Sequence, residues 1–151
     1  MNDESLQLVT FRLQDEEFGI DIKRVHEINR IIDVTKIPNA PSYIEGIINL
    51  RGKIIPVVSL RSKLGFDQAE YDKMTRIMVV EIESKVLGFI VDSVSEVLRI
   101  EDPKIEAPPS ITGANDAGYI KGVINLADRI LILLDLDTLF GEESKKDRLA
   151  A

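Results

Sequence analysis

Apolar and polar residues alternate along much of the chain, and this pattern predicts β-strands rather than helices. Near the N-terminus, Val9, Phe11 and Leu13 alternate with polar residues, and a polar turn at 14–17 separates them from the mostly apolar run 18–22. A period of two residues places every second side chain on the same face of a strand. Further strands are predicted at 47–50, 53–58, 76–82, 86–91, 94–100, 122–126 and 129–135.

Helices are predicted to be short and few, at 41–44, 60–64 and 136–140. Pro56 lies inside the predicted strand 53–58 and has no N–H to donate, so we expect it at a sheet edge or a bulge. Many short strands separated by turn residues are typical of small β-barrels or sandwiches. The pattern therefore predicts an all-β protein.

The second half of the chain repeats the first, with two different offsets. The first offset, which places Gly19 on Gly88, also places Glu27 on Glu96 within a matching strand pattern. The second offset, which places Tyr43 on Tyr119, aligns 43–60 with 119–136 and gives eight identities in 18 positions. Average residue usage gives about one identity by chance over such a length.

The second offset is the longer of the two, which indicates an insertion near 101–118, where prolines and a glycine predict an irregular connection. We therefore predict two copies of one β unit, at about 6–64 and 75–140. A pair of similar small barrels has a groove between them, and such grooves are common binding sites.

Charge and composition exclude several classes of partner and site. The 151 residues include 19 Lys and Arg and 26 Asp and Glu, a net charge of −7. A net negative surface repels phosphate groups, so we expect no nucleic acid and no direct membrane contact. The absence of cysteine excludes disulfides, zinc–thiolate sites and thiol nucleophiles. Without a secretory leader or an apolar run long enough to span a membrane, we expect a soluble, cytoplasmic protein.

Catalytic chemistry has few candidate residues. His26 is the single histidine, and its neighbour Glu27 points to the opposite face if both lie in a strand. The segment 46–53 lacks the glycine spacing of a phosphate-binding loop, and Ile54 stands where that loop has Ser or Thr. We therefore expect no enzyme activity, no metal and no cofactor. A small acidic hydrolase centred on His26 is the alternative from a different class.

Arg51 is the most distinctive candidate for binding. It lies with Gly52 on the tight turn between two predicted strands, where its planar guanidinium can pair with a partner's carboxylate or with Glu27. The second repeat keeps Glu96 but has Ala127 where the first has Arg51. We therefore expect the ion pair to be lost in the second half, and this asymmetry favours a binding role for Arg51 over a purely structural one.

The run 43–60, with Asn-Leu-Arg-Gly followed by an apolar strand that contains proline, resembles the CheW family of chemotaxis coupling proteins. The segments 18–28 and 88–98 resemble the same family, and the likeness covers about 6–140. The resemblance implies a single CheW-like domain over 1–151. Its fold would be two intertwined five-stranded SH3-like β-barrels, with some strand exchange between the two subdomains.

The resemblance also implies a function without catalysis. Members of this family link the cytoplasmic hairpin tips of chemoreceptors, the methyl-accepting chemotaxis proteins, to the histidine kinase CheA, so that the receptor state controls the kinase. The chain would act in the cytoplasm, held at membrane-anchored receptor arrays through protein contacts. The resemblance leaves the contact with the regulatory domain of the kinase unassigned to residues. The receptor-binding residues that it implies, with Ile28 added as a further apolar anchor, are Val25, Glu27, Ile28, Gly46 and Arg51.

Two other readings remain open at this point. The regulatory domain of a CheA-type kinase has the same fold, although a start at Met1 without an ATP-binding or phosphotransfer segment favours a separate coupler. An SH3-like module for proline-rich peptides needs an aromatic-lined groove, and the chain has eight aromatic residues and no tryptophan.

Overall fold

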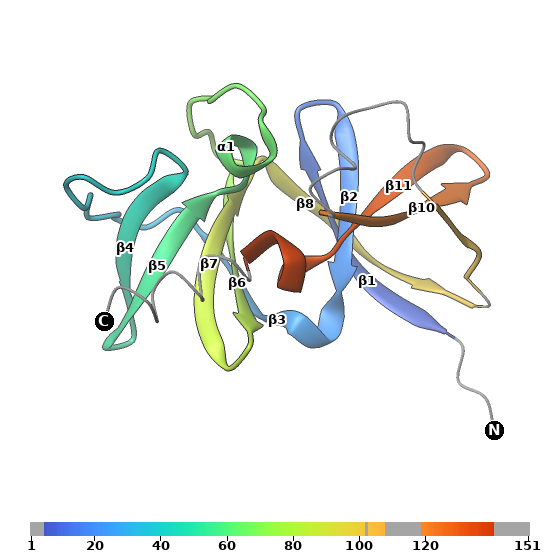
Figure 1. The fold of residues 1–151 in the computed structure, drawn as a ribbon, viewed down its shortest axis with the longest axis horizontal. Helices are drawn as coiled ribbons and strands as arrows, with labels where there is room; N and C mark the ends of the chain where they lie inside the picture. Colours follow the sequence, from blue (N-terminus) through green and yellow to red (C-terminus); the bar gives the residue numbers. More distant parts are fainter. Residues whose placement is uncertain (1–4, 102, 108–118, 141–151) are drawn as a thin grey trace.

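Two β-sheets lie side by side and make up most of the chain (Figure 1). The computed structural model describes residues 5–101, 103–107 and 119–140. The five-stranded sheet has the spatial order β3 (Val25–Arg30), β6 (Arg76–Ile82), β7 (Lys85–Val91), β5 (Lys53–Ser59) and β4 (Ile44–Leu50). The six-stranded sheet has the order β8 (Ser93–Ile100), β1 (Leu6–Leu13), β2 (Glu16–Asp21), β11 (Arg129–Leu134), β10 (Ile120–Leu126) and β9 (Ile105–Glu106).

The prediction of an all-β protein is confirmed. The six-stranded sheet has one strand more than expected, because the two residues of β9 pair with Val123 and Ile124 of β10 at the sheet edge. The expectation of few and short helices also holds for the described residues, in which each helical segment is at most five residues long.

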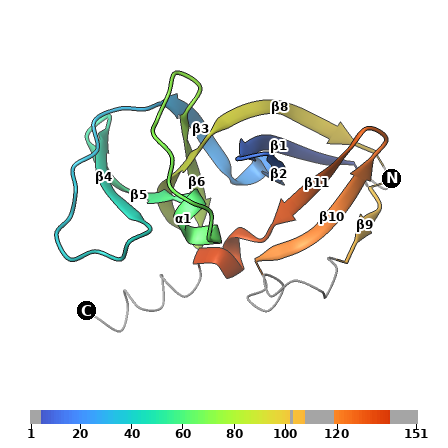
Figure 2. The ribbon, with the colours of Figure 1, turned by 90° about the horizontal axis from the view of Figure 1, so that it is seen from above.

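Each sheet combines strands from both halves of the chain. The hairpin β1–β2 pairs with β8 and β11, whereas the hairpin β6–β7 pairs with β3 and β5. Two short connections lead from one sheet to the other: η1 (Ile22–Arg24) joins β2 to β3, and Asp92 joins β7 to β8. The view from above shows the five-stranded sheet on the left and the six-stranded sheet on the right (Figure 2).

The sequence repeat has a direct counterpart in strand pairing. In the six-stranded sheet β2 pairs in parallel with β11, which places Gly19 opposite Leu133. In the five-stranded sheet β7 pairs in parallel with β5, which places Gly88 opposite Val57. The first offset carries Gly19 onto Gly88, and the second carries Val57 onto Leu133. The two offsets found in the sequence therefore describe one pairing made twice.

Close packing explains the glycine in β7. A Cβ added at Gly88 would lie 2.9 Å from Cγ2 of Ile77, closer than real Cβ atoms come to their neighbours. The packing beside Gly19 is looser, because a Cβ there would lie 3.4 Å from Leu131. A larger residue at Gly88 would therefore have to displace the buried side chain of Ile77.

One hydrophobic core joins the two sheets. Phe11 of β1 and Phe89 of β7 are fully buried, and their ring centroids lie 5.9 Å apart although the strands belong to different sheets. Phe18 and Phe140 extend this aromatic row at either end, 5.9 Å from Phe11 and 6.1 Å from Phe89. A smaller cluster lies inside each sheet, around Ile48 in one and Leu131 in the other. The shared core fixes the two sheets relative to each other.

Two of the three predicted helices are present. The predicted helix 60–64 is α1 (Leu60–Leu64), which Ser59 caps at its N-terminus and Gly65, with a φ of 88°, at its C-terminus. Residues 136–140 are also helical. Both segments contribute apolar side chains to the shared core.

The helix predicted at 41–44 is wrong. The carbonyl of Pro41 accepts a hydrogen bond of 3.0 Å from the N–H of Ile44, which closes a turn. Ile44 is already the first residue of β4 and lies opposite Val58 of β5. The pairing with β5 therefore overrides the local preference of this short segment.

Pro56 has the edge-like position that its missing N–H predicts. It lies opposite Ile47 of β4, and the parallel pairing of β5 with β7 begins only at Val57. At the proline β5 therefore has a paired neighbour on one side. Among the described residues, no helix is both long enough and apolar enough to cross a membrane.

Candidate functional site

The ion pair between Arg51 and Glu27 forms at the turn from β4 to β5. Arg51 and Gly52 both have left-handed backbone, with φ of 51° and 87°, and the side chain of Asn49 accepts a hydrogen bond of 2.9 Å from the N–H of Gly52. In this tight turn Nη2 of Arg51 donates to Oε2 of Glu27 on β3. Arg51 exposes 70% of its side chain, so most of the guanidinium faces solvent while one nitrogen is bound.

Glu27 is held on both of its carboxylate oxygens. Its other oxygen, Oε1, accepts a hydrogen bond of 2.9 Å from the side chain of Asn29. The hydrogen bond from Arg51, followed by that from Asn29, lowers the pKa of Glu27 below its usual value. The same bond raises the pKa of Arg51. The pair therefore stays charged at neutral pH, and Glu27 has a fixed orientation.

A groove of about 450 Å³ lies beside this pair. Leu50, Ile55 and Val79 give it an apolar floor, and Arg51 and Lys53 lie at its rim. The full set of lining residues is His26, Glu27, Leu50, Arg51, Lys53, Ile54, Ile55, Val79 and Val86.

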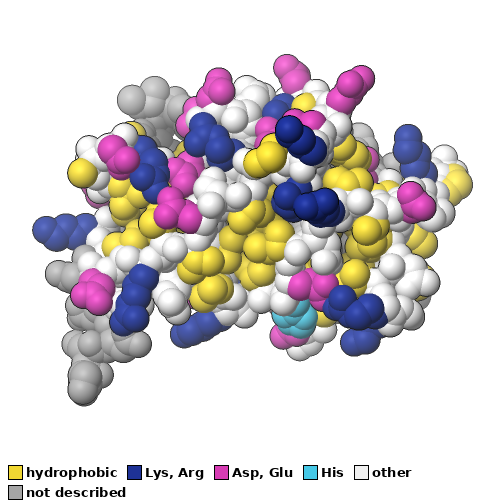
Figure 3. Space-filling model, turned by 180° about the vertical axis from the view of Figure 1, so that it is seen from behind, with side chains coloured by type: hydrophobic (Ala, Val, Ile, Leu, Met, Phe, Trp, Pro, Cys, Tyr) yellow, Lys and Arg dark blue, Asp and Glu magenta, His cyan; other side chains and the backbone are white. Residues whose placement is uncertain are grey.

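Apolar surface is also exposed around this site. Ile54, which lines the groove, exposes 63% of its surface, and Ile28 on β3 exposes 37%. Figure 3 shows the single histidine, in cyan, among acidic and basic side chains near the lower edge of one face, with hydrophobic side chains gathered in the middle of that face. An apolar surface bordered by charges is typical of a protein-interaction site.

The structure brings two of the five predicted receptor-binding residues into the groove, Glu27 and Arg51. Val25 packs against the shared core and is half-buried, and Ile28 lies further along β3 outside the lining. Gly46 is buried beneath the segment before β4, because a Cβ there would clash with the carbonyl of Thr35. Its φ of 150° is also one that other residues rarely adopt.

His26 pairs with Glu81, not with a serine or a second histidine. Its Nε2 lies 3.2 Å from Oε1 of Glu81, and both side chains are about half exposed. The described residues contain no group of three His, Asp or Glu side chains that could hold a metal ion.

The ion pair expected to be missing from the second half is present there, so the argument from asymmetry is wrong. Nη2 of Arg129 lies 3.1 Å from Oε2 of Glu96, the counterpart of Glu27. Arg129 is the counterpart of Lys53 and not of Arg51, and it reaches Glu96 from the first position of β11. The sequence did contain a sign of this pair, namely a basic residue, Arg129, two positions after Ala127. It was missed because only Ala127 aligns with Arg51.

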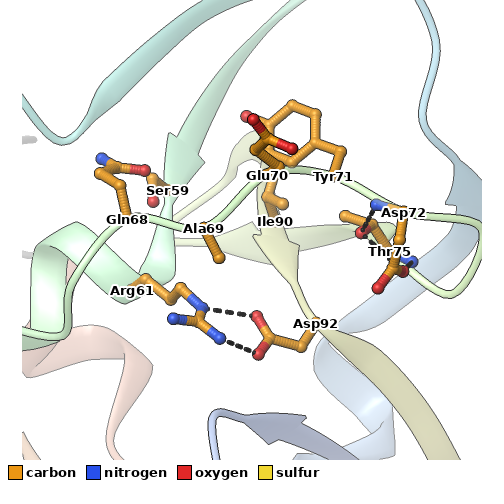
Figure 4. Close-up of a pocket in the computed structure, with 10 residues that line it drawn as sticks. All are labelled: Ser59, Arg61, Gln68, Ala69, Glu70, Tyr71, Asp72, Thr75, Ile90 and Asp92. Atoms are coloured by element: carbon orange, nitrogen blue, oxygen red, sulfur yellow. Dashed lines mark hydrogen bonds and ion pairs between the residues drawn. The ribbon is translucent and has the colours of Figure 1, made fainter.

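The sequence also concealed a second charged pair, between Arg61 of α1 and Asp92 (Figure 4). Nε of Arg61 donates to Oδ1 of Asp92 at 2.8 Å, and Nη2 donates to Oδ2. The pair lies in a small polar pocket of about 80 Å³ whose lining includes Tyr71 and Thr75. Since the two residues are 31 positions apart, no local pattern links them.

An apolar cavity of about 230 Å³ lies between the end of α1 and the six-stranded sheet. Leu64 and Phe66 line one side, and Phe18, Tyr119 and Ile132 are among the residues of the other side.

An all-β fold of two similarly built sheets, with exposed ion pairs and a groove at a strand turn, defines a class of small protein-interaction modules. The chain belongs to the CheW family, because the family model described as the CheW-like domain matches residues 7–144.

Relatives and a solved structure agree with this assignment. The chain is 35% identical to the chemotaxis protein CheW of Rhizobium meliloti, covering 93% of this chain and 90% of that protein. It is 37% identical to the chemotaxis protein CheW of Treponema pallidum, covering 95% and 86%. The crystal structure of the scaffolding protein TtCheW from Thermoanaerobacter tengcongensis matches with a TM-score of 0.82 at 42% identity, covering 89% of this chain and 92% of that one. The SH3-like fold that the resemblance implied is therefore confirmed.

Proposed function

We propose that this chain is a non-catalytic chemotaxis coupling protein. It bridges the cytoplasmic hairpin tips of chemoreceptors to the histidine kinase CheA and makes the activity of the kinase depend on the receptor state. The observation that carries this proposal is the exposed Arg51 at the mouth of an apolar groove, in a chain whose relatives are chemotaxis proteins.

The groove suits one face of a receptor helix. A helix in a groove is held by apolar side chains at its centre and by polar contacts at its rim. Leu50, Ile55 and Val79 supply the apolar floor, and Ile54 adds exposed surface at the mouth. The free nitrogens of Arg51 can pair with a carboxylate of the receptor and so fix the register of the helix.

Val25, Ile28 and Gly46 take other parts in this proposal. Ile28 extends the apolar contact along β3, and Val25 supports the strand from the shared core. Gly46 acts on the receptor contact through the fold, since the missing side chain lets Thr35 come close enough to pair with Ile47 of β4.

Signal transfer then requires only a difference in affinity. If the groove binds one receptor state more tightly than the other, the complex with the kinase is linked to the receptor state by a coupling free energy. No reacting group of the chain takes part. The chain would act in the cytoplasm, held at receptor arrays by its protein partners and not by a cofactor, a nucleic acid or the membrane.

The names of the relatives favour a coupler over a kinase regulatory domain. The relatives named chemotaxis protein CheW that are described above match over 86–90% of their own length.

Reconstitution tests the proposal. The chain is mixed with a purified receptor signalling fragment and CheA, and autophosphorylation of the kinase is measured with and without the chain. We expect kinase activity to depend on the receptor fragment only when the chain is present. Equal activity with and without the chain, at concentrations that saturate binding, contradicts a coupling role.

A further inference from the structure

The groove beside Arg51 has a counterpart in the six-stranded sheet, because both sheets are built from the same repeat. The two offsets of the repeat give the counterpart of each lining residue. The acidic residue and most of the apolar residues are kept, since Glu27, Leu50, Ile54 and Ile55 correspond to Glu96, Leu126, Ile130 and Leu131. Val79 of the floor corresponds to the buried Thr10. Ile54 and Ile130 are also similarly exposed, at 63% and 59%.

Two coupled changes introduce an ion pair into the second copy. Val86, an apolar lining residue of the groove, corresponds to Glu17, and Lys53 corresponds to Arg129. Nε of Arg129 lies 2.7 Å from Oε1 of Glu17, whose side chain is only 6% exposed. A buried carboxylate needs such a partner, and the hydrogen bond to Glu17 raises the pKa of Arg129.

The guanidinium of Arg129 bridges the two sides of the second copy. It contacts Glu17 on one side and Glu96, at 3.1 Å, on the other, and it also lies 3.2 Å from Asp128. In the first copy the residues at these two places are Val86 and Glu27, which both line the open groove. Val86 has no polar group that could hold the side chain of Lys53 across the first groove, so this groove remains open.

The turns at the two grooves also differ. Arg51 and Gly52 have positive φ angles, and this backbone directs Arg51 toward Glu27. Ala127 and Asp128 do not have positive φ angles. The second copy therefore lacks both the exposed arginine and the turn that would present it.

We propose that Arg129, anchored by Glu17, plugs the second copy of the groove, so that the chain binds one receptor hairpin and not two. This inference rests on the proposed function, because it takes the receptor hairpin as the occupant of the first groove. A coupler with two equal grooves would cross-link receptors through itself. The plug leaves one groove for that partner and makes the two sheets unequal in binding.

The first arm of the test transfers the plug into the open groove. The variant K53R/V86E carries at positions 53 and 86 the pair that Arg129 and Glu17 form. We expect the affinity for a receptor signalling fragment, measured by isothermal titration calorimetry, to fall at least about tenfold, or about 1.4 kcal/mol. The control K73R makes the same change at an exposed lysine outside the groove lining and should bind like the native chain.

The second arm opens the plugged copy. The variant E17V/A127R/D128G/R129K introduces the turn of the first groove and its residues at these four positions, while Thr10 and Ser95 stay in the places of Val79 and His26. We expect the stoichiometry to rise from one to two hairpins per chain, with circular dichroism confirming that the variant is folded. If this variant does not fold, the first arm decides.

The outcomes separate this inference from the proposed function. A native chain that does not bind the fragment overturns the proposed function and the inference with it. A native chain that binds, together with a K53R/V86E variant that binds equally well or a folded four-residue variant that still binds one hairpin, overturns the plug alone.

Discussion

Asp92 accepts two hydrogen bonds from Arg61, and this pair ties α1 to the connection between the two sheets. Oδ2 of Asp92 also accepts a hydrogen bond of 2.9 Å from the backbone N–H of Gln14, in the turn of the β1–β2 hairpin. One carboxylate therefore joins α1, the connection from β7 to β8, and the turn between β1 and β2. Arg61 exposes only 16% of its side chain, so the pair is well shielded from water.

The other connection between the sheets has an ion pair of opposite polarity. Arg24 of η1 lies 2.7 Å from Asp137 in the helical segment after β11. Asp137 is the counterpart of Arg61 under the second offset, and Arg24 follows Lys23, the counterpart of Asp92 under the first. Each connection between the sheets therefore has an ion pair, here called a charged clamp. In one clamp the connection carries the acid, Asp92, and in the other it carries the base, Arg24.

Removing the carboxylate of Asp92 should destabilise the protein. The variant D92A removes two of the hydrogen bonds of Arg61, which keeps only its bond to the carbonyl of Asp67, and it removes the acceptor for Gln14. We therefore expect a loss of about 1–3 kcal/mol in the free energy of unfolding. Urea unfolding followed by circular dichroism measures it. The exposed Asp33 provides the control D33A, which should change little. Equal midpoints for D92A and the native chain would show that the clamp contributes nothing.

The same pair predicts a dependence of stability on pH. Burial by itself raises the pKa of Asp92, but the hydrogen bonds from Arg61 and Gln14 and the positive charge of Arg61 lower it below its usual value. A carboxyl whose pKa is lower in the folded state adds stability above its unfolded pKa of about 3.9 and loses it as the pH falls through the folded value.

The comparison of the native chain with D92N tests this dependence. We expect the native chain to be more stable than D92N at pH 7 and the difference to shrink as the pH is lowered from 5 to 2. Urea unfolding over this pH series gives the two curves. A difference that stays constant would mean that the pKa of Asp92 is the same in the folded and unfolded states.

Reversing the charge of Arg51 should weaken receptor binding without unfolding the chain. In R51D the exposed cation at the rim of the groove is lost and a carboxylate faces Glu27, so we expect at least about a tenfold loss in affinity for a receptor signalling fragment, or about 1.4 kcal/mol. Pull-down and titration calorimetry measure binding, and thermal melting checks the fold. The control R12D makes the same change at an exposed arginine in the other sheet. Unchanged binding by R51D would remove this rim from the proposed interface.

Gly46 and Gly52 should respond differently to substitution by alanine. A methyl group at Gly46 would meet the carbonyl of Thr35, whereas nothing lies within 4 Å of the corresponding position at Gly52. We therefore expect G46A to cost about 1–3 kcal/mol through overpacking and G52A, where only the positive φ is strained, to cost about 1 kcal/mol. Denaturant unfolding of both variants measures the contrast. If G46A is no less stable than G52A, the segment around Thr35 can move away from the added methyl group without loss of stability.

The sequence predicted most of the fold because its strands are regular and repeated. The alternation of apolar and polar residues located β6 at its observed bounds, and the short helix predicted at 60–64 is α1. It failed at 41–44, where the long-range pairing of Ile44 with Val58 decides the structure, and it did not detect β9. Such short segments have too few residues for a period to be visible.

The candidate site was predicted less completely than the fold. The pair of Glu27 with Arg51 was visible because both residues stand out in the repeat. Arg129 was not, since an alignment of residue with residue does not reveal that an arginine two positions later can reach the same carboxylate. The clamp at Asp92 joins residues 31 positions apart and has no local pattern at all.

The parallel pairing of β2 with β11 brings residue 18 next to residue 132. During synthesis, the N-terminal hairpin therefore leaves the ribosome long before β11 has been made. Its apolar face stays uncovered on that side until then. Contacts between such distant residues slow folding and prolong the exposure of nascent strands. Expressed separately, the two halves of the gene should each give an aggregation-prone product, and co-expression offers each fragment the complement that it lacks.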